Sequence, residues 1–154
     1  MIADSKKNKS DPPQEKLKFI LELFNSSKII DAKNEIEKQA TIYPNSSILF
    51  NILGAILAVQ NKKEEAIENY KKAIKINPNY AQAYNNLGGV YYKSKKINEA
   101  IDSYKKAISL RNDFAEPFNN LGNAMRELMM PEKALPYFEK AIKIKSDYFE
   151  AYWN

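Results

Sequence analysis

The residue types that carry most protein chemistry are missing from this chain of 154 residues. It contains neither Cys nor His, which excludes thiol nucleophiles, thiolate metal sites and the commonest general base. Four Gly are too few for a phosphate-binding loop combined with several tight turns. No Ser or Lys has a spacing that provides an activating partner for nucleophilic catalysis. We therefore expect no catalytic residue, no metal site and no cofactor in this segment.

Asn is the polar residue that recurs at a regular distance. Two rows repeat at the same constant interval: Asn51, Asn85 and Asn119 in one, and Asn86, Asn120 and Asn154 in the other. An Asn side chain offers one acceptor and two N–H donors, so a row of amides can pair with the backbone of an extended peptide. The competing interpretation is that Asn, which is frequent throughout this sequence, only fills soluble helix surfaces.

The charged residues are mixed rather than concentrated. The chain has 24 Lys and Arg against 19 Asp and Glu, a net charge of +5. Acids precede lysines by one helical turn at Glu68–Lys72 and Asp102–Lys106, a spacing that stabilises helix surfaces. We predict solvated helix faces and no nucleic-acid partner. No apolar run is long enough to cross a membrane, and residues 1–11 form no signal peptide, so the expected location is cytoplasmic.

The interval that separates the Asn residues also holds for apolar positions. Small and bulky residues form columns in register: Gly54, Gly88 and Gly122; Ala66, Ala100 and Ala134; Tyr70, Tyr104 and Phe138. Within one unit, Tyr84, Leu87, Gly88 and Tyr91 follow the i, i+3, i+4, i+7 spacing of one helix face. A second helix follows each first one, and the small residues allow the two to approach closely. Short helix pairs cannot bury such faces alone, which predicts an all-α stack of helix–turn–helix units.

Helix start signals follow the same interval. Four residues suited to an N-cap recur where each new unit begins: Asn45, Asn79, Asp113 and Asp147. Gln82, Glu116 and Glu150 follow the last three at the spacing of a capping box, which predicts three such boxes. We therefore interpret these two Glu as capping residues and not as catalytic carboxylates.

These columns resemble the tetratricopeptide repeat, a helix–turn–helix unit of about 34 residues. Residues 81–114 (AQAYNNLGGVYYKSKKINEAIDSYKKAISLRNDF) carry nearly every signature position. The resemblance implies an α-solenoid with a right-handed superhelix whose first helices line a concave groove. It divides the chain into a flexible tail at 1–12, a degenerate N-terminal cap at 13–46, repeats at 47–80, 81–114 and 115–148, and the start of a further unit at 149–154.

Two departures from the family pattern carry structural expectations. The first unit has Phe19-Ile20 where Leu-Gly is usual, which leaves its groove face undetermined and suits a terminal cap. The usual turn Gly between paired helices is replaced by Ser27, Asn61, Lys95 and Met129. A left-handed backbone there is tolerated by Asn and costs more for Lys and Met.

By the same resemblance, the groove is lined by eight residues of the first helices: Asn51, Asn85, Asn86, Tyr92, Asn119, Asn120, Asn123 and Arg126. The sequence Asn-Asn-Leu-Gly at 85–88 and 119–122 is similar to the repeats of O-linked N-acetylglucosamine transferase. The cations that clamp a terminal carboxylate in chaperone-tail-binding repeats are absent at the corresponding positions, so that specialised function is disfavoured.

Three functional hypotheses follow. The leading one is a protein-interaction module that binds an extended peptide or a partner helix in an Asn-lined groove. The alternative is the N-terminal, substrate-recruiting arm of a larger glycosyl- or sulfotransferase. Self-association through the exposed C-terminal end is a third. Because the last segment, 149–154, stops within an expected helix, we also expect that the natural polypeptide continues or that this end meets another molecule.

Overall fold

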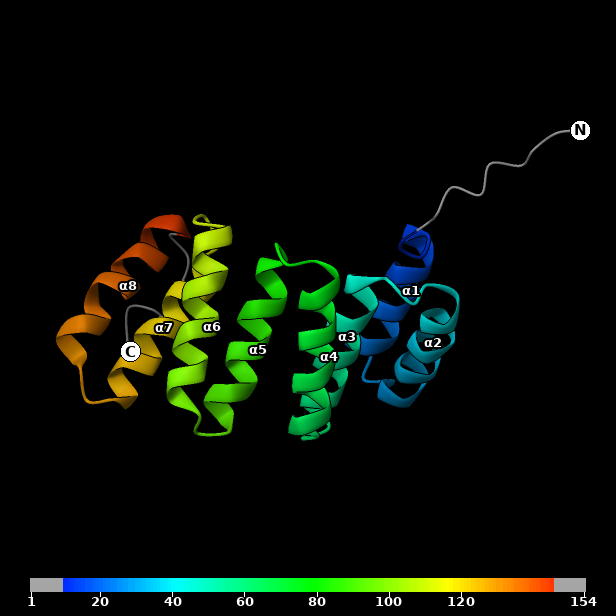
Figure 1. Ribbon diagram of the computed structural model, residues 1–154, viewed down its shortest axis with the longest axis horizontal. Helices are drawn as coiled ribbons and strands as arrows, with labels where there is room; N and C mark the ends of the chain where they lie inside the picture. Colours follow the sequence, from blue (N-terminus) through cyan, green and yellow to red (C-terminus); the bar gives the residue numbers. More distant parts are fainter. Residues whose placement is uncertain (1–9, 146–154) are drawn as a thin grey trace, which may run out of the picture. The chain divides into compact units, whose positions relative to one another are not determined.

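The computed structural model describes residues 10–145, and within them all regular structure is α-helical. The chain divides into two compact units, residues 1–77 and 78–154, each with four described helices (Figure 1). The first unit contains α1 (Gln14–Asn25), α2 (Ile29–Ile42), α3 (Ser47–Val59) and α4 (Lys63–Ile76). The second contains α5 (Ala81–Lys93), α6 (Ile97–Leu110), α7 (Ala115–Glu127) and α8 (Pro131–Ile144). The predicted all-α fold of helical repeats is confirmed, whereas the right-handed superhelix stays a prediction.

Close pairing of successive helices depends on a glycine that faces an aromatic ring. A Cβ added to Gly54 would lie 2.7 Å from Cε1 of Tyr70 on the paired helix. The same contact recurs between Gly88 and Tyr104, and Gly122 would meet Phe138 at 2.5 Å. Real Cβ atoms do not approach ring carbons this closely, so only glycine fits. The columns of small and aromatic residues therefore fix the approach of α3 to α4, α5 to α6, and α7 to α8 (Figure 1).

The first helix pair is packed in a different way. Ile20 occupies the glycine position on α1, and Ile36 replaces the aromatic residue on α2. Both isoleucines are fully buried. The bulk has moved from the second helix to the first, and α1 and α2 approach less closely than the other pairs do. Because α1 carries a larger side chain than the usual glycine and α2 a smaller one than the usual aromatic residue, this helix pair keeps a filled core without the usual Leu-Gly pair.

The turns within the helix pairs have a left-handed residue at the predicted position. Ser27, Asn61, Lys95 and Met129 have φ between 57° and 59°, and they are the non-glycine residues with positive φ in the described part of the chain. In the last of these turns, the Met129 N–H donates to the Arg126 carbonyl, and the next N–H, of Met130, donates to the Met125 carbonyl. These bonds satisfy carbonyls at the end of the helix, and the left-handed residue makes them reachable.

Helix starts differ from the sequence prediction by one residue. The N-caps of α3, α5 and α7 are Ser46, Tyr80 and Phe114, so the predicted caps at the preceding Asn and Asp were wrong. The predicted cap at position 147 lies outside the described residues. Ser46 is fully buried, and its Oγ accepts the Leu49 N–H at 3.4 Å while donating to Asp11 Oδ1 at 2.5 Å. The segment before α1 is thereby held against the start of α3.

Within the second unit, apolar side chains join one helix pair to the next. Ile101 and Tyr104 of α6 form a buried cluster with Leu121 and Ala124 of α7. Burial raises the pKa of the Tyr104 hydroxyl far above its ordinary value of 10, and the pKa of Tyr70 rises for the same reason. Both rings therefore remain neutral core residues at physiological pH.

Two kinds of site were not found in the part of the chain that the structure describes. None of its helices is long and apolar enough to span a bilayer. Among the same residues, no group of three or more acidic side chains could hold a metal ion.

Candidate functional site

The predicted groove residues lie on three first helices and differ in their exposure. Asn51 is on α3, while the other seven are on α5 and α7 of the second unit. The first row of Asn is buried: Asn51, Asn85 and Asn119 expose only 7%, 8% and 4% of their surface. In the second unit, Asn86, Asn120, Asn123 and Tyr92 are half-buried and Arg126 is exposed. Only this second set offers side-chain surface to a ligand without rearrangement.

A hydrogen bond between two Asn side chains links neighbouring repeats. Nδ2 of Asn120 on α7 donates to Oδ1 of Asn85 on α5 at 3.0 Å. These residues are 35 positions apart, so each belongs to a different one of the two Asn rows. These two amides therefore bind each other, and their hydrogen bond joins α5 to α7.

The start of α5 carries a second amide pair. Gln82 Nε2 donates to Asn86 Oδ1 at 3.1 Å, one helical turn apart. A bond of this kind restricts the rotation of the Asn86 side chain. The Asn86 amide is therefore held in one orientation on the half-buried face of α5.

At the other end of the same helices, Tyr92 belongs to a charged cluster. Lys95, in the left-handed turn after α5, forms an ion pair of 2.7 Å with Glu127 on α7. This hydrogen-bonded contact lowers the pKa of the Glu127 carboxyl and raises the pKa of the Lys95 ammonium. Tyr92 also hydrogen-bonds to Glu127, which contributes to the lowered pKa. Both charged side chains are solvent-exposed, so the ion pair adds little to stability.

Helix α7 also has two amide oxygens without a partner. Oδ1 of Asn119 and Oδ1 of Asn123 are inaccessible to solvent and accept no hydrogen bond from the described residues. Asn119, Asn123 and Arg126 follow the i, i+4, i+7 spacing and share one face of the helix. A buried acceptor without a donor costs about 1–3 kcal/mol, so each oxygen is a place where an N–H donor would stabilise the protein.

We call the five accessible predicted residues the amide surface. It consists of residues from α5 and α7: Asn86, Tyr92, Asn120, Asn123 and Arg126. Its chemistry is that of neutral donors and acceptors with one aromatic ring and one guanidinium group. Such a set can hold polypeptide backbone, but it contains no nucleophile paired with an activating base.

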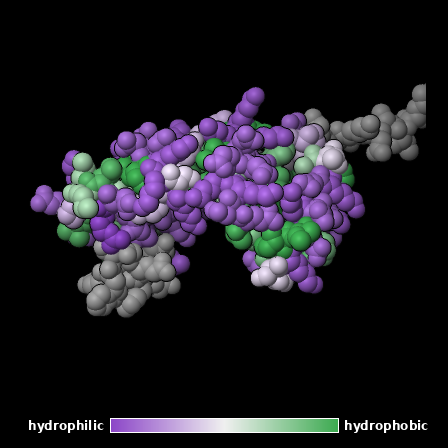
Figure 2. Space-filling view, turned by 90° about the horizontal axis from the view of Figure 1, so that it is seen from below, coloured by the Kyte–Doolittle hydropathy of each residue, from purple (hydrophilic) through white to green (hydrophobic). Residues whose placement is uncertain are grey.

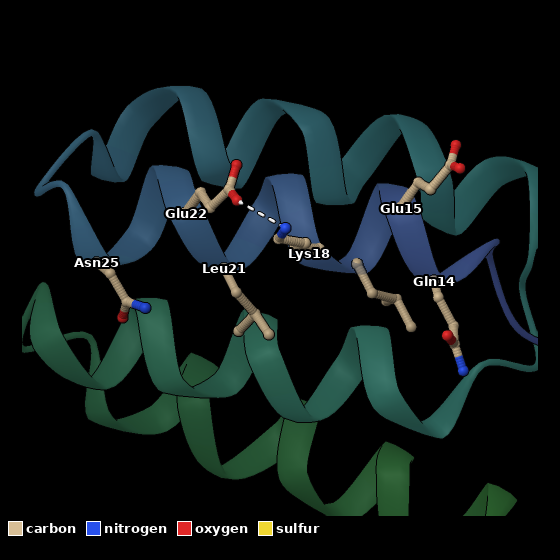
Figure 3. Close-up of a pocket in the computed structure, with 7 residues that line it drawn as sticks. Gln14, Glu15, Lys18, Leu21, Glu22 and Asn25 are labelled. Carbon is tan, nitrogen blue, oxygen red and sulfur yellow. Dashed lines mark ion pairs between the residues drawn. The ribbon is translucent and has the colours of Figure 1, made fainter.

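The first unit has a pocket that the sequence did not predict. It lies on α1, has a volume of about 580 Å³, and is lined by Gln14, Glu15, Leu17, Lys18, Leu21, Glu22 and Asn25. In Figure 3 the Leu21 side chain points from α1 toward α3, with the Lys18–Glu22 ion pair of 3.8 Å at the opposite edge. Leu21 is 42% exposed. The sequence contained a signal, because Leu21 directly follows the buried Ile20 and therefore lies on another part of the helix surface.

Exposed apolar side chains occur in both units. Figure 2 shows hydrophobic surface over the helices of the first unit and around α8. Exposed residues of the first unit include Leu21, Ile30 and Val59, and those of the second include Met129 and Leu135. Patches of this kind on soluble proteins often mark contact surfaces.

Comparison with known families identifies the repeats in three of the four helix pairs. Models described as TPR repeat and tetratricopeptide repeat match residues 54–95, 90–128 and 115–148. Together these matches extend over more than half of the chain. A comparison with curated proteins finds no match.

Solved structures of similar fold are repeat proteins. The crystal structure of MamA is 26% identical, with a TM-score of 0.77, and the match covers 95% of this chain and 84% of that one. PilF of Pseudomonas aeruginosa has a TM-score of 0.84 at 24% identity, covering 90% of this chain and 63% of that one, and shows the fold alone. YrrB, described as a TPR protein with an unusual peptide-binding site, is 28% identical with a TM-score of 0.69, covering 75% and 60%.

Proposed function

We propose, from the premise that this chain belongs to the tetratricopeptide repeat family, that its amide surface binds an extended peptide. The family and its solved relatives support a protein-interaction module in general terms. The finer assignment to Asn86, Tyr92, Asn120, Asn123 and Arg126 is our proposal. YrrB supports peptide as the class of ligand, since that protein is described as having a peptide-binding site.

The observation that carries the proposal is the unpartnered oxygen of Asn123. Its side chain is half-buried on the face of α7 that also bears Arg126. Solvent does not reach this oxygen in the structure, so the half-buried Asn123 side chain must rotate to present it to a ligand. A peptide N–H that then donates to the oxygen recovers the cost of the missing bond. Recognition through backbone N–H groups predicts tolerance of many peptide sequences. The buried Asn51 and Asn85 take no direct part in this scheme.

The guanidinium group of Arg126 extends the surface beyond the amides. It can donate to two peptide carbonyls or to an acidic side chain of the ligand. Tyr92, held by Glu127, offers its ring to apolar side chains of the same ligand. The alternative proposal, a recruiting arm of a larger transferase, would use the same surface for a substrate segment. The cytoplasm is the proposed location in either case.

The proposal is tested by selection from a library of displayed, short and unstructured peptides on the full chain of 154 residues. Binding of the selected peptides is then measured by fluorescence anisotropy. We expect Asn123→Ala and Arg126→Ala each to weaken binding roughly 5- to 30-fold, corresponding to about 1–2 kcal/mol. Methylation of the peptide backbone nitrogen that pairs with Asn123 should have a similar effect on the native protein and little effect on Asn123→Ala.

The matched control is Lys106→Ala, an exposed position on the second helix of the same repeat as α5. It should leave affinity unchanged. Peptides that bind the native protein, Asn123→Ala and Arg126→Ala equally would overturn the assignment to the amide surface. Retention of binding when Leu21→Ser is introduced distinguishes this surface from the pocket on α1.

A further inference from the structure

A second pocket of the first unit is lined by two lysines and by no acidic residue. It has a volume of about 620 Å³ and lies between the turn after α2 and the end of α4. Its lining residues are Pro44, Asn45, Lys72, Lys75 and Ile76. The two lysines are three positions apart on α4, so they share one face of that helix. We call this site the lysine pocket, and its lining carries two positive charges and no negative one.

Neither of these lysines is neutralised by a neighbouring side chain. Glu68 precedes Lys72 by one helical turn, a spacing suited to an ion pair, but the Lys72 ammonium lies 3.7 Å from the centroid of the Phe50 ring instead. In the described part of the chain, no carboxylate is within ion-pair distance of Lys72 or Lys75. Phe50 is buried, so its ring is fixed and keeps the Lys72 ammonium in place by a cation–π contact.

The equivalent position two repeats later in the sequence has a different charge. A pocket of about 320 Å³ in the second unit lies between the start of α7 and the end of α8. Its charged lining residues are Arg111, Asp113, Glu116 and Lys145. Asp113 corresponds to Asn45, and Ile144 corresponds to Ile76. The charges of this equivalent pocket cancel, whereas those of the lysine pocket do not.

We propose that the lysine pocket binds the phosphate group of a phosphorylated serine or threonine on a partner polypeptide. A phosphate monoester carries about −1.5 to −2 charges at pH 7, which matches the two lysines. Its oxygens accept hydrogen bonds from both ammonium groups and from the side-chain amide of Asn45. A single carboxylate would leave one of the two positive charges unpaired. The proposal does not depend on peptide binding by the amide surface.

The lining of the lysine pocket favours a phosphorylated side chain over a phosphate ion from solution. Pro44, Asn45, Lys72 and Lys75 are all exposed, so a group that projects from a larger molecule can enter. Ile76, the proline ring and the methylene stems of the lysines add apolar surface. This surface can contact the carbon atoms of the residue that bears the phosphate, whereas an inorganic ion makes no use of it.

Binding is tested by NMR on the full chain of 154 residues, with the backbone amide signals of Asn45 and Ile76 as reporters. The probe is the peptide acetyl-Ala-Ala-pSer-Ala-Ala-amide, and the same peptide without phosphate is the reference. We expect saturable shifts of both reporters with the phosphorylated peptide alone. The amides of Asp113 and Ile144 in the equivalent pocket should not respond. Reporters that do not shift, that shift equally with the reference peptide, or that shift together with the equivalent pocket would overturn the proposal.

Substitutions at exposed positions identify the residues that hold the phosphate. Lys72→Gln and Lys75→Gln should each weaken binding roughly 3- to 10-fold, because each removes one of the two charges. Asn45→Asp should also weaken it, since it copies Asp113 and brings a carboxylate to the lining. The matched control is Lys62→Gln, which removes the same charge at the opposite end of α4 and should leave affinity unchanged. Equal weakening by all of the lysine variants would mean attraction by net charge alone and would contradict the proposal.

A titration with inorganic phosphate distinguishes the two sources of the anion. Because the ion makes no apolar contact, we expect it to bind the lysine pocket more weakly than the phosphorylated peptide does. Inorganic phosphate that shifts the same reporters with equal or higher affinity would make this an ion site only, and the assignment to a phosphorylated partner would then be wrong.

Discussion

The ring of Tyr104 occupies the space that a side chain on Gly88 would need, because a Cβ there would lie 2.6 Å from ring carbon Cε1. A Cβ on the adjacent Gly89 would meet no neighbouring atom within 4 Å. Two successive glycines in one helix therefore have opposite roles. The first sets the distance between α5 and α6, and the second only weakens the helix.

Substitution of these two glycines should change stability in opposite directions. Gly89→Ala should stabilise the protein by about 0.5–1 kcal/mol, since alanine loses less backbone entropy in a helix. Gly88→Ala gains the same amount but loses about 1–3 kcal/mol to overpacking against Tyr104, for a net loss of up to about 2.5 kcal/mol. Urea denaturation of both variants measures the difference. Stabilisation by Gly88→Ala would show that the ring can move aside.

Replacement of the left-handed turn residues by glycine should stabilise the protein, and the gain should differ between turns. Met129 has φ of 57° and is 88% exposed, so its side chain contributes little packing. Met129→Gly should raise stability by about 1 kcal/mol, as the left-handed conformation has no steric cost in glycine. Lys95→Gly should gain less, because it also removes the ion pair with Glu127. Denaturant midpoints of the two variants give the ranking, and a larger gain at Lys95 would contradict it.

The Lys95–Glu127 pair predicts a measurable change in one carboxyl pKa. Lys95 lowers the pKa of Glu127 below its ordinary 4.5, and Lys95→Met should move this pKa back toward that value. Because the folded pKa is lowered, the contribution of Glu127 to stability is present above pH 4.5 and lost as pH falls through the folded pKa. NMR titration of the Glu127 carboxyl measures the change. Lys96→Met, the neighbouring exposed lysine, serves as a control.

At alkaline pH the buried tyrosines predict a loss of stability. The pKa values of Tyr70 and Tyr104 are raised by burial, so folding retains two protons that the unfolded chain releases above pH 10. Their contribution is complete below pH 10 and decreases as pH rises toward the folded pKa values. Tyr70→Phe and Tyr104→Phe should each flatten this decrease. Phe138, which occupies the equivalent position beside Gly122, indicates that the ring fits without its hydroxyl. Thermal unfolding at a series of pH values from neutral to alkaline provides the measurement.

The sequence predicted the features that follow from periodicity. The columns of Gly and aromatic residues indicated which faces pair, and the four turn residues indicated where the backbone becomes left-handed. These predictions succeeded because residues at equivalent positions of successive repeats occupy the same local environment. The N-caps failed by one residue, since Ser46 takes the capping position that its neighbour Asn45 could also have filled.

The candidate site was less predictable for a physical reason. Periodicity gives the position of an Asn in the repeat, but it does not distinguish a side chain directed at the next helix from one directed at solvent. Asn85 and Asn86 are adjacent in sequence, yet one is buried in a bond to Asn120 and the other is half-buried beside Gln82. The pocket at Leu21 escaped prediction because the first repeat departs from the common pattern.

In the first helix pair, Ile20 and Ile36 replace the glycine and the aromatic ring of the other pairs, and this has a consequence for recombination among the repeats. Conversion of the first pair to the pattern of the others requires two substitutions, Ile20→Gly and Ile36→Tyr. Taken singly, the former leaves a hollow between α1 and α2, and the latter places a ring against an isoleucine that already fills the space. Every single-step route thus passes through a less stable protein. Shuffling that cuts between these two helices should therefore yield poorly folded chimeras, while exchange of the intact helix pair preserves its matched volumes.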